Sequence, residues 1–231
     1  MKQILKFLSE LAHNNNREWF KANKQQWETV KTEANGLAAM LIDIVSEVDS
    51  RASMLSLSDC TYRIYRDTRF SSDKTPYKRH IGIFINPPAG KKSLTCGYYF
   101  HFEPRNCIVA AGTVCLPSPV IKAIRKDIYD NIEEYVGIVE SPEFRQYFNE
   151  IGENLLKTAP KGYPKEWEYM AYIRPRDFVA SCHVSDSFFE KRGLRERVLP
   201  MAQQMKRFND FINYSIEPFE NVDSYGCNSE S

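Results

Sequence analysis

Residues 79–115 read RHIGIFINPPAGKKSLTCGYYFHFEPRNCIVAAGTVC, and this stretch decides the fold. It contains three apolar runs rich in Tyr, Phe, Ile and Val, and short segments with Pro, Gly and Asn separate them. Such runs between turn residues are typical of β-strands, and connections this short join antiparallel neighbours. We therefore predict an antiparallel β-meander with strands at Arg79–Asn86, Leu94–Phe102 and Cys107–Cys115.

Helical patterns lie on both sides of this meander. Before it, apolar residues recur at helical spacing over residues 4–11 and 16–49, where Asn35-Gly36 favours an interruption. Two further strands are predicted, at Thr61–Asp67 and Asp177–Val184. The remaining predicted helices are those over residues 118–136, from Ser141 onward, around residues 165–170 and over residues 193–214.

The order of these elements defines the expected fold class. Helices, then strands, then helices favour α+β, here an antiparallel β-meander of about four to five strands flanked by N-terminal and C-terminal helices. We expect one domain over residues 1–215 because no linker divides the chain. Residues 216–231 are polar and small, so we expect a disordered tail there.

Composition excludes several classes of protein. The net charge is +1, so the chain lacks the overall charge that attracts nucleic acid or acidic membranes. The 6 cysteines include no CxxC pair, which argues against zinc fingers and disulfide frameworks. No run approaches the ~18 apolar residues of a membrane span, and the N-terminus lacks a signal-peptide pattern. We therefore expect a soluble, cytoplasmic protein that does not act in a membrane.

One dense polar segment, residues 61–80, reads TYRIYRDTRFSSDKTPYKRH. Its six Lys and Arg residues and two aspartates give a local charge of 6 − 2 = +4. On the predicted strand Thr61–Asp67 side chains alternate, so Arg63 and Arg66 project to opposite faces of the sheet. An arginine presents a planar fork of donors that suits phosphate or carboxylate. The segment therefore predicts a cleft that binds an anion.

Four stretches of the chain resemble an uncharacterised family. They are residues 7–20, with Asn14-Asn15 and REWF; residues 63–78, with RxxRDTRFSxDKTPYK; residues 97–99, GYY; and residues 159–163, APKGY. In these motifs the chain is similar to the family called domain of unknown function 2461, over about residues 4–214. The resemblance implies no particular activity or cofactor and leaves the function open.

The candidate ligand-binding residues are the cations and carboxylates of the polar segment: Arg63, Arg66, Asp67, Arg69, Asp73, Lys74 and Lys78. Lys74 and Tyr77 are also candidates for a base or nucleophile, because nearby positive charge favours a neutral amine and a phenolate. The pair His101-x-Glu103 and the distant His183 lack a third ligand at motif spacing, so we predict no metal site.

Four further cations of interest lie outside the polar segment. Lys122, Arg125 and Lys126 fall on one face of a predicted helix, which indicates a solvated face. Lys161, in a loop with Pro and Gly, is a minor candidate to join the anion-binding cleft.

Three functions remain open at this point. The first is a protein that binds a phosphorylated or carboxylated small molecule, with any reaction, cofactor and oligomeric state undetermined. The second is a module for single-stranded nucleic acid, in which bases stack on Tyr62, Tyr65, Phe70 and Tyr77, although the neutral overall charge argues against it. The third is a non-catalytic interaction protein, in which Asp67 and Asp73 pair with arginines and brace the segment.

Overall fold

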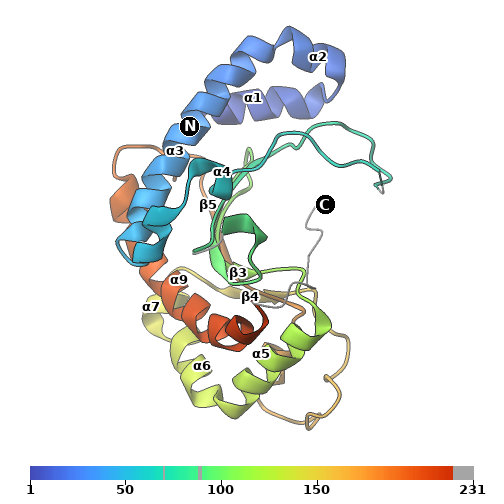
Figure 1. The fold of residues 1–231 in the computed structure, drawn as a ribbon, viewed down its shortest axis with the longest axis vertical. Helices are drawn as coiled ribbons and strands as arrows, with labels where there is room; N and C mark the ends of the chain where they lie inside the picture. The colour runs from blue at the N-terminus through green and yellow to red at the C-terminus, as the bar shows by residue number, and fades with distance from the viewer. Residues whose placement is uncertain (70, 88–89, 221–231) are drawn as a thin grey trace.

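A five-stranded antiparallel sheet forms the centre of the molecule (Figure 1). The computed structural model describes residues 1–69, 71–87 and 90–220. The strands are β1 (Ile81–Ile85), β2 (Gly97–Phe102), β3 (Cys107–Thr113), β4 (Glu150–Glu153) and β5 (Asp177–Val184), in the order β1-β2-β3-β5-β4. The α+β fold and the predicted meander β1-β2-β3 are confirmed.

The two faces of the sheet differ because side chains alternate along each strand. In β2, Tyr98, Phe100 and Phe102 point to one face and are fully buried. Between them, Tyr99 and His101 point to the other face, which we call the histidine face. The core therefore lies on the first face.

The histidine face is less thoroughly covered. It also carries Phe84, opposite Tyr99, and Ile108 and His183, which lie in one row with His101 across the strands. Phe84, Tyr99 and Ile108 are half-buried and His183 is exposed. Solvent therefore reaches part of this face.

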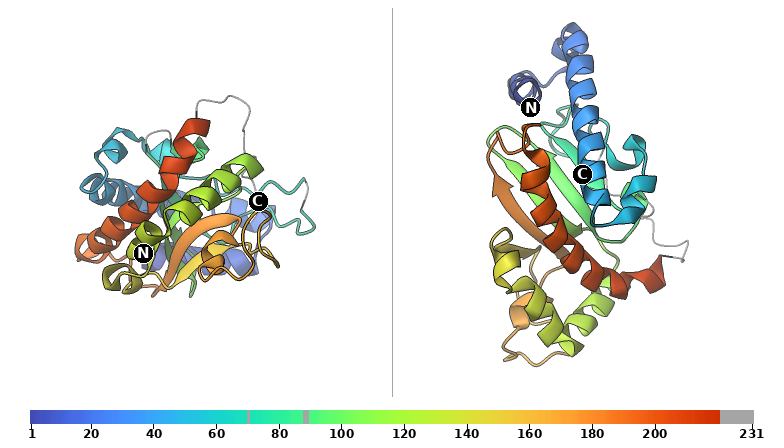
Figure 2. Two further views of the ribbon diagram at one scale, coloured as in Figure 1. Left: turned by 90° about the horizontal axis from the view of Figure 1, so that it is seen from below. Right: turned by 90° about the vertical axis from the view of Figure 1, so that its left-hand side faces the viewer.

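Two long helices cover the core face. α9 (Leu194–Ile216) packs on β2 and β3, and α3 (Lys24–Ser46) packs on β1. Figure 2 shows both helices on the same side of the sheet. The buried residues of α9 recur at the spacing of one helical face: Leu194, Val198, Met201, Ala202, Met205, Phe208 and Ile212.

The N-terminal region forms a helical hairpin that leads into α3. α1 (Lys2–His13) is followed by α2 (Arg17–Ala22), whose first turn is capped by the Asn16 side chain, which accepts a hydrogen bond from Trp19 N at 2.8 Å. The predicted second helix is divided at Asn23 instead of at Asn35-Gly36, which lie inside α3. Burial of neighbouring α3 residues outweighs the low helix propensity of Asn and Gly.

The remaining elements connect the strands or lie below the sheet. The helices are α4 (Leu57–Cys60), α5 (Ser118–Asp130), α6 (Ile132–Val139), α7 (Pro142–Arg145) and α8 (Met170–Ile173), with short 3-10 helices η1 (Ser50–Met54), η2 (Gly90–Lys92) and η3 (Glu217–Phe219). The predicted helix over residues 118–136 is divided at Asn131, and the short one predicted around residues 165–170 begins only at Met170. The short edge strand β4 was not predicted, since its sequence EIGE lacks an apolar run.

The first residues of the predicted C-terminal tail are helical in the structure. Residues 216–220, placed by the sequence in the tail, continue α9 and form η3. The Glu220 carboxylate accepts hydrogen bonds from Leu94 N and Ser93 Oγ, both at 2.8 Å, and so ties this end to the start of β2. The rest of the predicted tail, residues 221–231, lies outside the described residues. Within the part of the chain that the structure describes, no helix is long and apolar enough to span a membrane.

Candidate functional site

The polar segment forms an arm that extends away from the sheet (Figure 1). We use the name arm for residues 61–80, of which residue 70 lies outside the described ones. Two backbone hydrogen bonds join its strands, from Arg66 N to Pro76 O at 2.9 Å and from Lys78 N to Ile64 O at 2.8 Å. The predicted strand Thr61–Asp67 is therefore wrong: among the described residues, this stretch pairs with the sheet only at an isolated bridge between Thr61 and Ile83.

Arg66 is bound within the arm by Asp73. Its Nη1 donates to Asp73 Oδ2 at 2.6 Å and to Thr75 Oγ1 at 2.5 Å. The same Asp73 carboxylate accepts from Thr75 N at 2.9 Å, which closes a tight turn. The Thr75 N–H, then Arg66, lowers the pKa of Asp73 to about 2, so this carboxylate is ionised at neutral pH.

The other predicted residues of the arm tip also find partners close by. Arg69 forms a bidentate pair with Asp67, donating through Nε at 2.9 Å and through Nη2. Lys74 Nζ donates to the carbonyl oxygen of Thr68 at 2.8 Å. These contacts join neighbours within the loop, as expected if the arginines brace it.

Tyr77 fixes the arm to the helical hairpin. Only 4% of Tyr77 is exposed, and its ring stacks on Phe20 with centroids 4.0 Å apart. The Asn15 side chain pairs with both backbone groups of Tyr77, donating to its carbonyl at 2.9 Å and accepting from its N–H at 3.1 Å. Burial, and then Tyr65, raises the pKa of Tyr77. The sequence argument favoured a phenolate here, but burial outweighs the effect of nearby cations.

The root of the arm gathers aromatic and cationic side chains near the sheet. Lys78 Nζ lies 5.2 Å from the centre of the Tyr62 ring, and Lys91 Nζ lies 5.4 Å from the same ring. Lys91 also donates to the carbonyl oxygens of Ser58 and Thr61, both at 2.6 Å. Arg63 is exposed on the neighbouring stretch. Among the predicted ligand-binding residues, Lys78 lies near the histidine face, two residues before His80, and its positive charge helps to lower the pKa of His80.

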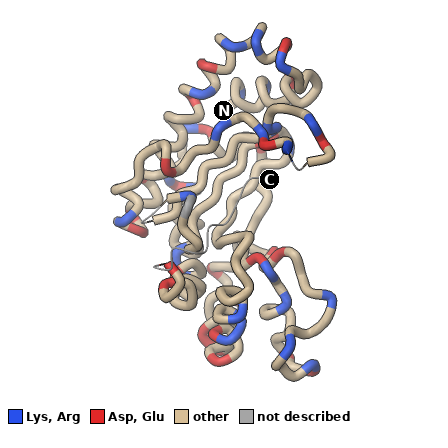
Figure 3. Tube along the Cα trace, turned by 45° about the vertical axis from the view of Figure 1, so that its right-hand side comes forward, with Lys and Arg blue, Asp and Glu red and all other residues tan. Residues whose placement is uncertain are grey.

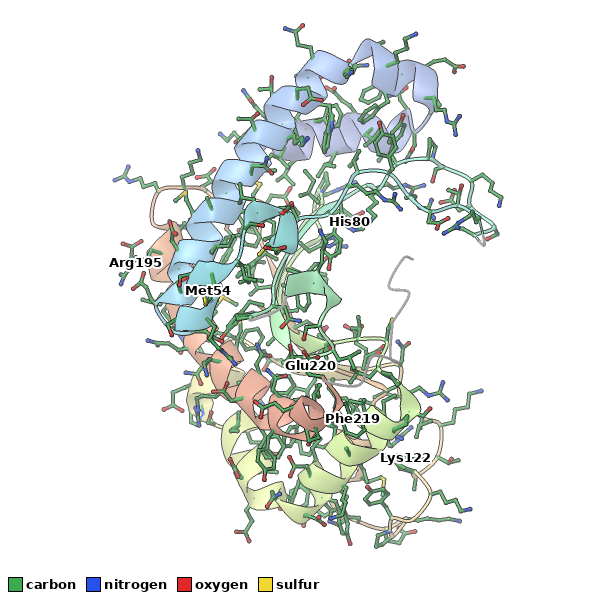
Figure 4. The ribbon with its side chains drawn as sticks, viewed as in Figure 1. Met54, His80, Lys122, Arg195, Phe219 and Glu220 are labelled. Atoms are coloured by element: carbon green, nitrogen blue, oxygen red, sulfur yellow. The ribbon has the colours of Figure 1, made fainter. Side chains whose placement is uncertain are left out.

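His80 and His101 form the centre of a polar cluster on that face. Their rings stack with centroids 4.4 Å apart, and His80 lies where the arm meets the sheet (Figure 4). His101 is 9% exposed and contacts Tyr99 Oη through Nδ1 at 2.9 Å and Glu103 Oε2 through Nε2 at 3.3 Å. Asn106 donates to the same Glu103 oxygen at 2.6 Å. We call Tyr99, His101 and Glu103, together with His80, the histidine cluster.

Burial sets the protonation of this cluster. It lowers the pKa of His80 to about 4, with a smaller contribution from His101, so His80 is neutral at pH 7. It also lowers the pKa of His101, although Glu103 opposes the change. Burial works against ionisation of Glu103, but hydrogen bonds from Asn106 and His101 prevail and the pKa of Glu103 is lowered. The cluster therefore combines neutral imidazoles with an ionised carboxylate.

The proton positions follow from these charges. An ionised Glu103 can only accept, so His101 Nε2 carries the proton and Nδ1 accepts from the Tyr99 hydroxyl. Gly82, directly opposite His101 on β1, leaves room for the Tyr99 ring: a Cβ at Gly82 would lie 2.9 Å from Tyr99 Oη. This line of groups has the order of a proton relay from tyrosine through histidine to carboxylate.

Metal binding finds no support at this cluster. Among the described residues, no group of three or more His, Cys, Asp or Glu side chains is arranged to hold a metal ion. His183 lies in the same row as His101, two strands away, and acts on it only electrostatically.

The comparison with protein families agrees with the motifs. Residues 3–211 match the model of DUF2461, which is described as a conserved hypothetical protein. The chain belongs to the DUF2461 family. No curated protein and no solved structure matches it.

In this DUF2461 chain, two of the motif stretches meet at one point. Asn15 belongs to the first stretch and Tyr77 to the second, and their paired hydrogen bonds join the helical hairpin to the arm. Asn15 and Tyr77 therefore have a structural role, since they hold the arm against the helical hairpin. They do not by themselves indicate a ligand.

The sequence indicates only part of the histidine cluster. His101-x-Glu103 stands out as a pair of possible metal ligands without a third, and nothing in the spacing points to His80. The signal present was the spacing of Tyr99, His101 and Glu103 at i, i+2 and i+4, which puts all three on one face of a strand. The approach of His80 depends on the course of the arm, which sequence spacing does not reveal.

Proposed function

We propose that this protein binds a phosphorylated or carboxylated small molecule at the root of the arm, with the histidine cluster as the polar floor of the site. Lys78 supplies positive charge, and the neutral His80 supplies a hydrogen-bond donor. Arg66 and Arg69 are left out of the direct contacts because each is engaged by its own aspartate. The site therefore shifts from the tip of the arm to its root.

The stacked pair His80–His101 is the observation that carries this proposal. Two imidazoles 4.4 Å apart, held neutral by burial, are costly to desolvate and contribute little to the apolar core. A buried histidine with a perturbed pKa on a partly accessible face marks a candidate functional site. The same face is bordered by Tyr62 and Lys78, which can contact a ligand above the strands.

Chemistry at this site would centre on Tyr99. A hydroxyl bonded to His101, which is in turn oriented by Glu103, can pass a proton to or from a bound ligand. Burial, and then Tyr62, raises the pKa of Tyr99, so its hydroxyl is protonated at neutral pH. We include in the proposal that this hydroxyl accepts a proton from the ligand while its own proton passes to His101 Nδ1 and the proton of His101 Nε2 passes to Glu103. The reaction class depends on the ligand.

The proposal is tested by titrating the protein with phosphate, sugar phosphates, nucleotides and dicarboxylates, with binding measured by calorimetry at fixed ionic strength. We expect a hit that Lys78→Gln and His101→Asn weaken by about tenfold or more each, which is about 1.4 kcal/mol. Lys6→Gln, on the exposed side of α1, is the matched control and should bind as the parent does. The proposal is removed if neither site variant weakens the binding of any of these compounds, or if none of the compounds binds.

A second candidate is single-stranded nucleic acid, and one observation favours it. Tyr62 and Tyr65 are exposed aromatic rings on the arm, with Arg63 between them, as in a stacking platform. Against it, Tyr77 is buried, Phe70 lies outside the described residues, and Figure 3 shows both signs of charge interspersed along the chain. Fluorescence anisotropy with oligonucleotides across a salt series decides: binding that falls steeply with salt supports this candidate, and no binding at low salt excludes it.

A further inference from the structure

Arg125 is a buried cation in the lower part of the molecule, on the helix that Lys122 marks in Figure 4. The sequence placed Lys122, Arg125 and Lys126 together on a solvated face. Lys122 and Lys126 are exposed as expected, but the prediction is wrong for Arg125, which is only 9% exposed. The buried side of α5 therefore carries a positive charge, whereas the other two cations of this group face solvent.

The guanidinium of Arg125 has few partners. Nη2 donates to the carbonyl oxygen of Pro175 at 2.7 Å, and Nε is buried without an acceptor. In the described chain, Arg125 forms no ion pair with an aspartate or glutamate. Burial lowers the pKa of Arg125, and the ionisable groups that act on it are Tyr163 and Arg176, neither of them a carboxylate. An arginine still keeps its proton under these conditions, so a buried positive charge lies beside a second cation.

The surrounding loop is built to hold this arrangement. Gly162, with φ of +98°, forms the turn that brings Tyr163 against Tyr129, with ring centroids 5.1 Å apart, and Tyr129 packs on Trp167 at 4.7 Å. Gly152 lets the Pro175 ring approach closely, since a Cβ at Gly152 would lie 2.2 Å from that ring.

The loop between β4 and β5 carries more positive than negative charge. Between β4 and β5, residues 154–176 contain five cations and two glutamates: Lys157, Lys161, Lys165, Arg174 and Arg176 against Glu166 and Glu168. The lower right of Figure 3 shows this predominance of Lys and Arg along the loop. A charge taken out of water is stable only with a counter-charge or full hydrogen bonding, and the described residues supply neither to Arg125.

We propose a second site, distinct from the histidine cluster, at which the phosphate group of a small ligand binds Arg125 with Arg176 and the Tyr163 hydroxyl. Arg125 donates to the phosphate from the guanidinium N–H groups that Pro175 does not engage, the exposed Arg176 contributes charge, and the Tyr163 hydroxyl donates a further hydrogen bond. The half-buried rings of Tyr129 and Trp167 border the site, where they can contact the organic part of a phosphorylated ligand.

The competing explanation is structural. In that case Arg125 serves only to bind the Pro175 carbonyl, and its charge has no ligand. Arg125→Met separates the two because it keeps most of the volume and removes the charge. The test is made in a Lys78→Gln background, which weakens the site at the root of the arm. A structural role predicts that Arg125→Met lowers thermal stability there and that phosphate has no effect with or without it. The proposed site predicts that phosphate raises the melting temperature and that Arg125→Met abolishes this rise.

The experiment measures phosphate binding by calorimetry at constant ionic strength, with chloride as the compensating ion. We expect Arg125→Met to weaken phosphate binding by about tenfold or more, and Arg176→Gln and Tyr163→Phe to weaken it less. Lys122→Met, which removes an exposed cation from the same helix, is the matched control and should bind as the parent does. All these variants are compared in the Lys78→Gln background, so phosphate bound at the root of the arm does not enter the comparison and failure of one proposal can be told from failure of the other.

The source of the phosphate group is settled by comparing inorganic phosphate, adenosine monophosphate and adenosine. Tighter binding of the nucleotide than of phosphate assigns the site to a phosphorylated ligand with an aromatic part, and equal binding assigns it to the anion alone. Should Arg125→Met fail to fold, Arg176→Gln and Tyr163→Phe carry the test. The proposal is overturned if the parent binds neither phosphate nor the nucleotide in the millimolar range, or if these variants bind as tightly as the parent.

Discussion

Arg66 and Asp73 show how the charged residues of the arm are used. The sequence indicates that both carry charge, and it predicts them as contacts to a ligand. In the structure they contact each other, because the turn at Asp73 places its carboxylate within reach of Arg66 and of the Thr75 N–H. Whether two opposite charges in a loop pair or point outward depends on backbone angles, which spacing along the chain does not specify. The same holds for Arg69 and Asp67.

The turn at Asp73 gives a direct test of this pairing. We expect the Asp73 carboxyl to titrate with a pKa of about 2, lowered chiefly by Thr75 N–H and next by Arg66. Carbon-13 NMR of the side chain across low pH measures it. Arg66→Ala should raise the pKa only part of the way to its ordinary value, since the Thr75 bond remains. A midpoint at the ordinary value in the parent protein would show that the turn does not form in solution.

His80 makes the stability of the fold depend on pH. Its folded pKa of about 4 lies below the ordinary value, so the unfolded chain binds a proton more readily than the folded one. This contribution to the free energy of unfolding is fully present above about pH 6.5 and is lost as the pH falls toward 4. We expect His80→Gln to flatten the pH dependence in that window, as measured by urea denaturation. An unchanged slope would mean that His80 is solvated in the folded protein.

At the scale of elements, long periodic segments were predicted well and the arm was not. The meander, β5 and α9 follow from apolar periodicity, and their residues are buried as the pattern requires. Thr61–Asp67 alternates like a strand, yet it pairs mainly within the arm, since its neighbours across the loop offer nearer backbone partners than the sheet does. Helix ends at Asn23 and Asn131 were missed for a similar reason: they are set by tertiary packing more than by propensity.

The arm depends on Asn15 for its position. Its amide makes two hydrogen bonds to the Tyr77 backbone, and removing them should cost about 1–3 kcal/mol of local stability. We expect Asn15→Ala to speed hydrogen exchange at the Tyr77 amide and its neighbours in the arm. Asn14→Ala is the control, because the Asn14 side chain bonds only within α1, to the Glu10 carbonyl. Equal exchange in the two variants would contradict this role for Asn15.

Two glycines in neighbouring strands should respond differently to alanine. At Gly82 the new Cβ meets the end of the Tyr99 side chain, which can move, so we expect a loss of about 1 kcal/mol or less. At Gly112, with φ of +119°, it meets the Phe178 carbonyl oxygen at 2.0 Å, and we expect a loss of several kcal/mol, roughly 3 or more.

Thermal denaturation ranks the two glycine variants, and nitrogen-15 NMR of His101 shows whether Gly82→Ala breaks its contact with Tyr99. A Gly82→Ala protein with an unchanged His101 spectrum would show that the Tyr99 ring does not occupy the space above Gly82. A Gly112→Ala protein as stable as the parent would contradict the close approach of β3 and β5.

At the scale of the whole molecule, one sheet separates two kinds of surface. Helices α3 and α9 cover one face (Figures 1 and 2). The histidine face remains partly accessible, since Phe84, Tyr99 and Ile108 are half-buried and His183 is exposed. The alternation of β2 already predicts that Tyr99 and His101 share a face. The addition of His80 and Lys78 needed the path of the arm, so the sequence could supply the residues of the cluster but not their assembly.

The central claim is that a small anionic molecule binds at the root of the arm. The most direct test is a map of backbone NMR shifts on titration with the tightest compound of the calorimetric panel. We predict that the largest shifts fall on residues 78–84 and 99–103, around the stacked histidines. Shifts confined to the tip of the arm near Arg66 and Arg69, or no localised shifts at saturating ligand, would contradict the account.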